Sequence, residues 1–166
     1  MTEENGKQDR PHSFFFDTSV SMRKYILRMG LISLVPSIII ALLLAVSGIA
    51  DEGSGPDFEG PALVVLPLVL IAGPAIETLL LAFTLWLLSF FAKRKVVLAL
   101  VSALIWAGLH SLAAPAWGLV VFWPFFVFSC SYLAWRERSW GRAVWVTFCI
   151  HVFQNVLPGI AIVSTL

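Results

Sequence analysis

Residues 62–92 read ALVVLPLVLIAGPAIETLLLAFTLWLLSFFA, and this stretch decides the fold class. Glu77 is its single ionisable side chain in about 31 residues. A straight helix of that length would measure roughly 46 Å, whereas the hydrocarbon core of a bilayer is roughly 30 Å thick. The run is therefore too long for one straight crossing. Gly73-Pro74 interrupts it, and because proline removes a helical hydrogen bond we expect a break or kink there.

Four further apolar stretches are each about long enough to cross a bilayer as a helix. They cover residues 27–50, 96–112, 117–135 and 143–163. The sequence therefore predicts an all-α, polytopic membrane helix bundle of about five transmembrane helices, with a broken or kinked second span. We expect residues 1–26 to form a cytoplasmic polar tail, in which residues 14–25 could lie along the interface, and residues 27–166 to form the transmembrane domain.

The composition agrees with a membrane protein and excludes several other classes. Hydrophobic residues make up 59% of the 166 residues and charged residues 13%, with a mean hydropathy of +0.90. Soluble domains run at about 45–50% and about 25%. A soluble enzyme and a disordered protein are excluded on these figures. The net charge of +1 excludes a nucleic-acid partner, and the lipid bilayer is the expected surrounding.

Basic residues gather in segments that alternate along the chain with acidic or uncharged ones. The basic clusters are Lys7, Arg10, Arg23, Lys24 and Arg28; Lys93, Arg94 and Lys95; and Arg136, Arg138 and Arg142. Because Lys and Arg mark the cytoplasmic side, five spans with a cytoplasmic N-terminus place every cluster inside. The first span is longer than the 7–15 residues of a signal-peptide core, so we expect an uncleaved anchor.

Few strongly polar side chains lie within the predicted spans. The second span holds Glu77, the third holds His110, and the fifth holds His151 and Asn155. Counted from the cytoplasmic end, they lie at depths of roughly 22, 21, 12 and 18 Å. An ionisable group at the bilayer centre costs at least about 2.5–3.5 kcal/mol and therefore marks a functional site by default. We expect the four side chains to meet at one place.

Other interpretations of these residues remain open. Each histidine alone is typical of interhelical packing, and Asn155 alone of a hydrogen bond between helices. Two histidines and one glutamate could also hold zinc, although the sequence has neither a helical His pair enclosing a Glu nor a spare carboxylate to orient the ligands. A proton pathway would use the same residue types, but no second cluster continues the route and no inverted repeat is present.

Three short motifs resemble those of one protein family. Pro74-Ala75-Ile76-Glu77 lies in the second span, an aromatic-x-x-x-His motif runs from Trp106 to His110, and a His-x-x-x-Asn motif runs from His151 to Asn155. Their order and spacing resemble the CPBP family, which contains the type II CAAX prenyl endopeptidases and bacterial Abi-type membrane proteins. The resemblance covers about residues 62–160. The first span and the N-terminal tail lie outside it.

The resemblance implies an intramembrane glutamic protease of a bacterial plasma membrane, acting on a membrane-associated peptide or protein without a cofactor. Glu77 would be the general base, His110 would position the attacking water, and His151 with Asn155 would stabilise the oxyanion. Where the family often has Glu-Glu-x-x-x-Arg, this chain has Thr78 and Ala82 in place of the second acid and the arginine. A non-catalytic binding or immunity protein that keeps the fold is the first alternative, and a proton-coupled transporter the second.

Overall fold

The computed structural model describes residues 13–49 and 60–164, in which helices joined by short connections make up almost the whole chain. The predicted polar tail before Ser13 and the acidic segment 51–59 lie outside the described residues. The elements in chain order are α1 (Ser13–Phe16), α2 (Met22–Val46), α3 (Ala62–Pro67), the π-helical turn η1 (Leu68–Ala72), α4 (Gly73–Leu88), α5 (Lys95–Ala113), α6 (Trp117–Arg136) and α7 (Trp140–Val163). The all-α fold class is confirmed.

Five helical segments are long and apolar enough to cross a membrane. They are Met22–Val46, Ala62–Leu88, Lys95–Ala113, Trp117–Arg136 and Trp140–Ile162. The five predicted spans are therefore confirmed as helices. The first begins at Met22 rather than residue 27, because a helix can continue into the polar interface, where Arg23 and Lys24 are exposed to solvent. The boundary expected between residues 26 and 27 thus falls inside α2.

The second span is one continuous helical segment that contains a π-helical turn where the sequence predicts a break. The Gly73 N–H donates to the Leu68 carbonyl, five residues back, in place of the usual fourth. Pro74 follows and carries no N–H. In this register the carbonyl that Pro74 leaves without a backbone donor is that of Val69. Such π-turns are frequent at functional sites and at helix kinks.

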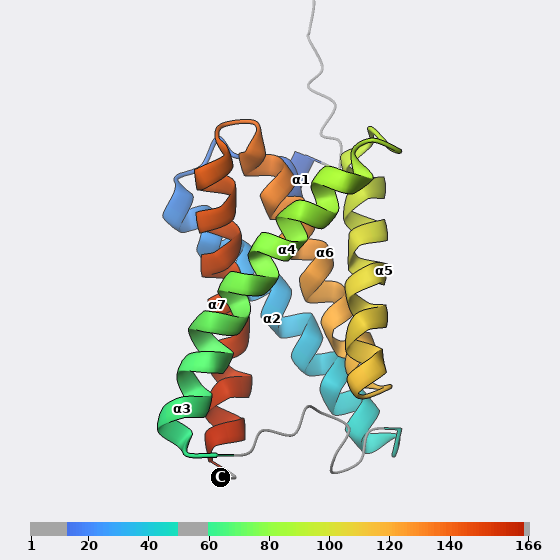
Figure 1. Ribbon diagram of the computed structural model, residues 1–166, viewed down its shortest axis with the longest axis vertical. Coiled ribbons are helices and arrows are strands. Elements are labelled where there is room, and N and C mark those ends of the chain that lie inside the picture. The colour runs from blue at the N-terminus through green and yellow to red at the C-terminus, as the bar shows by residue number, and fades with distance from the viewer. Residues whose placement is uncertain (1–12, 50–59, 165–166) are drawn as a thin grey trace, which may run out of the picture.

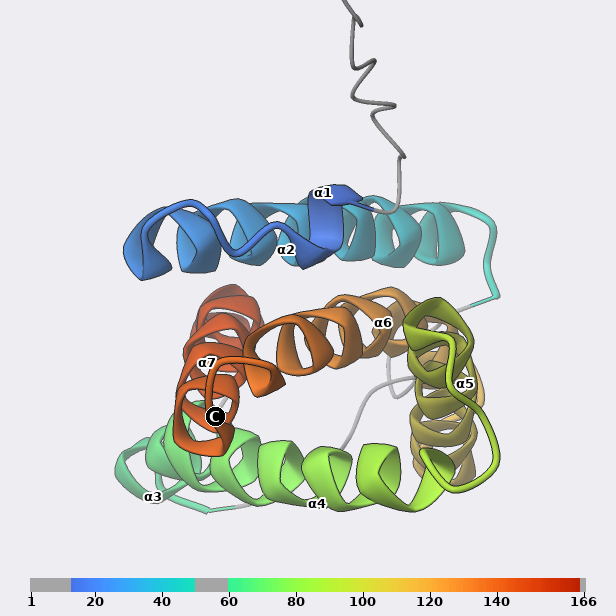
Figure 2. The same cartoon turned by 90° about the horizontal axis from the view of Figure 1, so that it is seen from above.

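Helix α6 lies in the middle of the bundle and is the most buried of the five spans. Figure 2 shows α2 along one side of it, α4 along the opposite side, and α7 and α5 closing the two ends. Aromatic and aliphatic side chains from these helices form one core around α6. Its largest fully buried members include Tyr25, Met29, Leu81, Leu85, Phe128 and Ile150.

Neutral polar side chains join α2 to the helices behind it. Gln154 of α7 accepts a hydrogen bond from the Ser33 hydroxyl and donates one to the Ser37 hydroxyl, both 2.7 Å long. All three side chains are buried. The Trp123 indole N–H of α6 donates to the carbonyl of Ile32 at 2.6 Å. Pro36 leaves that carbonyl without its helical donor, so Trp123 replaces a hydrogen bond that the proline removes.

The described basic clusters lie at one end of the bundle. In Figure 1 the start of α2, the α4–α5 connection and the α6–α7 connection are all at the top, with α1 beside them. Some of these cations are engaged: Lys95 pairs with Glu137, and the Arg138 guanidinium donates to Thr18. The helix ends that carry basic residues therefore lie at the same end of the bundle, as expected when successive spans run in opposite directions.

The short helix α1 packs against α6 at this basic end. The Tyr25 hydroxyl donates to the Phe15 carbonyl at 2.6 Å, and the Phe15 ring meets Phe126 edge to face. Asp17 then accepts hydrogen bonds from the backbone N–H and the hydroxyl of Ser19, which hold the pKa of its carboxyl below the usual value. The segment before α2 is thus tied to the bundle by specific contacts.

Candidate functional site

Glu77 and His151 approach each other between α4 and α7. Glu77 Oε2 lies 3.4 Å from His151 Nε2. The His151 side chain is only 5% exposed, whereas the Glu77 side chain is 32% exposed. Glu77 stands in the first turn and a half after Gly73-Pro74, so the π-turn sets the level and rotation at which α4 presents the carboxylate. The imidazole is therefore fixed inside the protein, and the carboxylate lies at its edge.

Both histidines pack against one aromatic ring. Phe125 of α6 lies with its ring centre 5.8 Å from that of His151 and 5.1 Å from that of His110. Phe128 contacts His151 from the next turn at 4.5 Å, and Trp117 meets His110 edge to face at 4.5 Å. Helix α6 therefore supplies an aromatic wall behind both imidazoles, which fixes the ring planes.

A backbone contact orients His110. Its Nδ1 lies 2.8 Å from the carbonyl oxygen of Trp106, one turn earlier in α5. A carbonyl can only accept, so Nδ1 carries the proton and Nε2 stays available as an acceptor in the neutral ring. Within residues 13–49 and 60–164, no ion pair joins His110 to Glu77. The structure thus brings Glu77 to His151 and leaves His110 beyond direct contact with the carboxylate.

The zinc interpretation requires at least three ligating side chains at one point. Over the described ranges, no group of three His, Cys, Asp or Glu side chains is arranged to hold a metal ion. The two histidines share Phe125 as a neighbour, but together with Glu77 they are not arranged as one ligand set.

Asn155 takes part in the architecture of the second span. Its Nδ2 donates to the Val69 carbonyl at 3.1 Å. That carbonyl belongs to η1 and is the one that Pro74 leaves without a backbone donor. Asn155 therefore satisfies a broken backbone position and ties η1 to α7, one helical turn from His151. Its amide has a second N–H besides the one used here.

The two positions that depart from the family motif both face the interior. Thr78 is 1% exposed and Ala82 is 5% exposed. The Thr78 hydroxyl is buried and has no hydrogen-bond partner among the described residues, and the same holds for Thr147 of α7. Helices α4 and α7 pack together, and each carries one such unpartnered hydroxyl near Glu77 or His151 in sequence, since Thr78 follows Glu77 and Thr147 lies one turn before His151. Such groups ordinarily bind water when they are buried.

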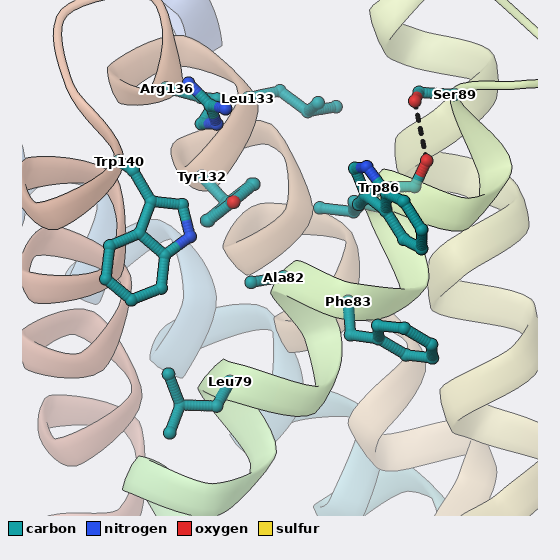
Figure 3. Close-up of a pocket in the computed structure, with 10 residues that line it drawn as sticks. Leu79, Ala82, Phe83, Trp86, Ser89, Tyr132, Leu133, Arg136 and Trp140 are labelled. Atoms are coloured by element: carbon teal, nitrogen blue, oxygen red, sulfur yellow. Dashed lines mark hydrogen bonds between the residues drawn. The ribbon is translucent and has the colours of Figure 1, made fainter.

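Two cavities open beside α4, and neither was predicted from the sequence. A cavity of about 550 Å³ lies between α4, α6 and the start of α7, towards the basic end (Figure 3). A second cavity of about 280 Å³ shares Leu79 and Trp140 with it and reaches Ala75 and Thr78, on either side of Glu77 in sequence. The four predicted site residues line neither cavity.

Sequence reasoning also missed the cluster of Gln154 with Ser33 and Ser37. Spacing gave one usable signal: Gln154 precedes Asn155, so the fifth span carries amides on two adjacent faces. Neutral amides and hydroxyls cost little free energy in a membrane helix and are common where such helices pack together. Gln154, Ser33 and Ser37 therefore do not stand out in the sequence as candidate site residues.

The fold and site together define a helical protein with five candidate membrane spans and a Glu–His pair between two of them. No protein-family model, characterised protein or solved structure gives a match to this chain. The resemblance to the CPBP family rests on the three motifs that the sequence carries.

Proposed function

We propose that the protein is an intramembrane endopeptidase in which Glu77 activates water to hydrolyse a peptide bond of a membrane-associated peptide or protein. The observation that carries the proposal is the 3.4 Å separation of Glu77 Oε2 and His151 Nε2 across two candidate membrane spans. This separation is slightly longer than a direct hydrogen bond, as catalytic contacts often are before substrate binds, so a small movement would let the two groups share a proton. The Glu77 side chain is 32% exposed, so the carboxylate is not sealed inside the helix packing.

The remaining residues take complementary roles in this proposal. His110, oriented by the Trp106 carbonyl, offers Nε2 to hold the water, and His151 with the second N–H of Asn155 stabilises the oxyanion. The unpartnered hydroxyls of Thr78 and Thr147 keep the region polar enough to admit water. Membership of the CPBP family and a bacterial plasma membrane belong to the same proposal.

The chemistry needs no group beyond these side chains. Glu77 accepts a proton from water as the oxygen attacks the scissile carbonyl, and the carbonyl oxygen gains the negative charge. The same proton then passes to the leaving amide nitrogen, the C–N bond breaks, and a carboxyl and an amino terminus result. Positioned acid–base groups of this kind contribute about 10²- to 10⁴-fold to a rate.

The test offers the purified full chain in detergent a library of membrane-tethered peptides and detects new termini by mass spectrometry. We expect cleavage by the wild type and a loss on the order of 10²- to 10⁴-fold in Glu77→Gln. Thr84→Val is the matched control, because Thr84 lies on the same helix and bonds only the Leu80 carbonyl of that helix. Equal cleavage by wild type and Glu77→Gln would remove Glu77 from the mechanism.

One observation favours the non-catalytic alternative. The Asn155 bond to the Val69 carbonyl is a structural contact, and the Glu77–His151 pair also joins α7 to the second span. A binding or immunity protein could retain these residues to hold its helices together. In that case Glu77→Gln lowers the unfolding temperature of the protein, and no peptide in the library is cleaved by the wild type.

A further inference from the structure

The larger cavity combines apolar walls with one cation at its rim. Leu79, Phe83 and Trp86 of α4 line one side, and Tyr132 and Leu133 of α6 line the other. Figure 3 shows Arg136 at the upper rim, with Trp140 and Trp86 on opposite sides below it. The lining is therefore graded, from the aliphatic Leu79 at the bottom to the guanidinium at the basic end of the bundle. A ligand that fits this gradient has an apolar chain and an anionic head.

Arg136 has no acidic partner among the described residues, and it interacts with the hydroxyl of Tyr132, which lines the same cavity. The Arg136 side chain is exposed, and no carboxylate of residues 13–49 or 60–164 lies within 4.0 Å of it. Lys95 at the same end differs, because it is paired with the carboxylate of Glu137. A guanidinium matches a phosphate in shape and charge, because two of its N–H groups can donate to two phosphate oxygens at once.

The position of the cavity in the bundle restricts the ligand further. Arg136 ends α6 at the level where the predicted spans leave the membrane, whereas Leu79 lies about two and a half turns of α4 inside it. Phe83, Trp86 and Trp140 are each more than half exposed on the protein, so the cavity opens sideways between helices, where lipid would lie. Basic pockets between membrane helices bind lipid head groups.

We propose that the cavity between α4, α6 and α7 binds one anionic phospholipid, with its phosphate on Arg136 and an acyl chain between α4 and α6. The volume of about 550 Å³ is within the range of ligand sites. The smaller cavity continues this space past Leu79 and Trp140 towards Thr78, so the chain end points to the level of Glu77. This proposal is independent of the proposed protease activity, since it uses none of the four catalytic candidates.

The test measures lipid binding to the purified full chain in detergent. Thermal unfolding and native mass spectrometry are recorded with phosphatidylglycerol, with phosphatidylcholine of the same acyl chains, and with inorganic phosphate. We expect phosphatidylglycerol to raise the midpoint and to stay bound at one molecule per chain. Phosphatidylcholine is expected to bind about tenfold more weakly or worse, because its choline cation meets Arg136.

Two variants and one control locate the lipid. Arg136→Gln removes the head-group partner, and Ala82→Leu fills the cavity from its wall; each should weaken phosphatidylglycerol binding about tenfold. Arg142→Gln makes the same charge change at an exposed residue of the same end that does not line the cavity, and should bind like the wild type. Each variant is first compared with the wild type without lipid, so that a folding defect is seen separately.

Four results would overturn the proposal. An equal loss in Arg142→Gln and Arg136→Gln would show a diffuse attraction to the basic surface. An equal midpoint shift with inorganic phosphate alone would show a free anion site, and equal binding of both phospholipids would show an apolar groove without head-group recognition. Unchanged binding in Ala82→Leu would place the lipid outside the cavity.

Discussion

The two faces of α7 carry polar side chains that are partnered in opposite ways. On the face towards α2, Gln154 uses both ends of its amide on Ser33 and Ser37, in a buried and neutral cluster. On the face towards α4, His151 meets Glu77 at 3.4 Å, and the carboxylate is one-third exposed and has no other hydrogen bond or ion pair among the described residues. The first cluster is closed and holds helices together, whereas in the second the Glu77 carboxylate keeps hydrogen-bonding capacity that no described residue uses.

The largest effect on activity should come from the face of α7 towards α4, where His151 meets Glu77. We expect His151→Ala to reduce peptide cleavage on the order of 10²- to 10⁴-fold, because it removes the ionisable group that pairs with Glu77 among the described residues. His151→Gln keeps an N–H near the same place and should recover part of the rate. The measurement is kcat/KM on the peptide identified in the library. Full activity in His151→Ala would break the contrast between the two faces.

Packing on the closed face should be sensitive to one added methyl group. A Cβ on Gly30 of α2 would stand 2.7 Å from the Phe153 ring of α7, so we expect Gly30→Ala to lower the free energy of unfolding by about 1–3 kcal/mol. Gly108→Ala is the control, since nothing lies within 4 Å of a Cβ there. Urea or thermal unfolding in detergent checks both, and equal stability of the two variants would show that α2 does not pack closely on α7.

The closed hydrogen-bond cluster should contribute to stability and not to catalysis. Gln154→Leu removes two hydrogen bonds and leaves Ser33 and Ser37 without their partner, so we expect a loss of about 1–2 kcal/mol, in the range of interhelical hydrogen bonds in membranes. The kcat/KM of the folded fraction should stay within about twofold, since these hydrogen bonds join α7 to α2 and involve neither Glu77 nor His151. A large fall in kcat/KM of Gln154→Leu with an unchanged free energy of unfolding would instead assign Gln154 to catalysis.

The spans could be predicted from the sequence because lipid requires about 20 apolar residues in a helix that satisfies its own backbone. The sequence could predict only that Glu77 and His151 lie in the same region of the bundle. The helical rise placed them about two turns apart in depth, with an error of about one turn. The bond from Asn155 to Val69 was out of reach. In a regular helix Pro74 would free the carbonyl of Leu70, and only the π-register of η1 moves the vacancy to Val69.

The smallest effects should come from the donors that replace backbone hydrogen bonds. Asn155→Leu leaves the Val69 carbonyl without a donor, and Trp123→Phe does the same to Ile32. We expect each to cost about 0.6–1.7 kcal/mol of unfolding free energy. Asn155→Leu should also reduce cleavage, because it removes the proposed oxyanion donor and the link to η1, which carries α4 and hence Glu77, whereas Trp123→Phe should not. Equal kinetic effects of the two variants would show that the link to η1 has no special role.

In the proposed mechanism Glu77 acts in catalysis, whereas Gln154 stabilises the packing of α2 on α7. The most direct measurement determines kcat/KM and the unfolding free energy of Glu77→Gln and Gln154→Leu on the same purified preparations. The account predicts a crossed result, in which Glu77→Gln loses on the order of 10²- to 10⁴-fold in kcat/KM with nearly unchanged stability, and Gln154→Leu loses stability with nearly unchanged kcat/KM. A fall in stability without loss of cleavage in Glu77→Gln would contradict it.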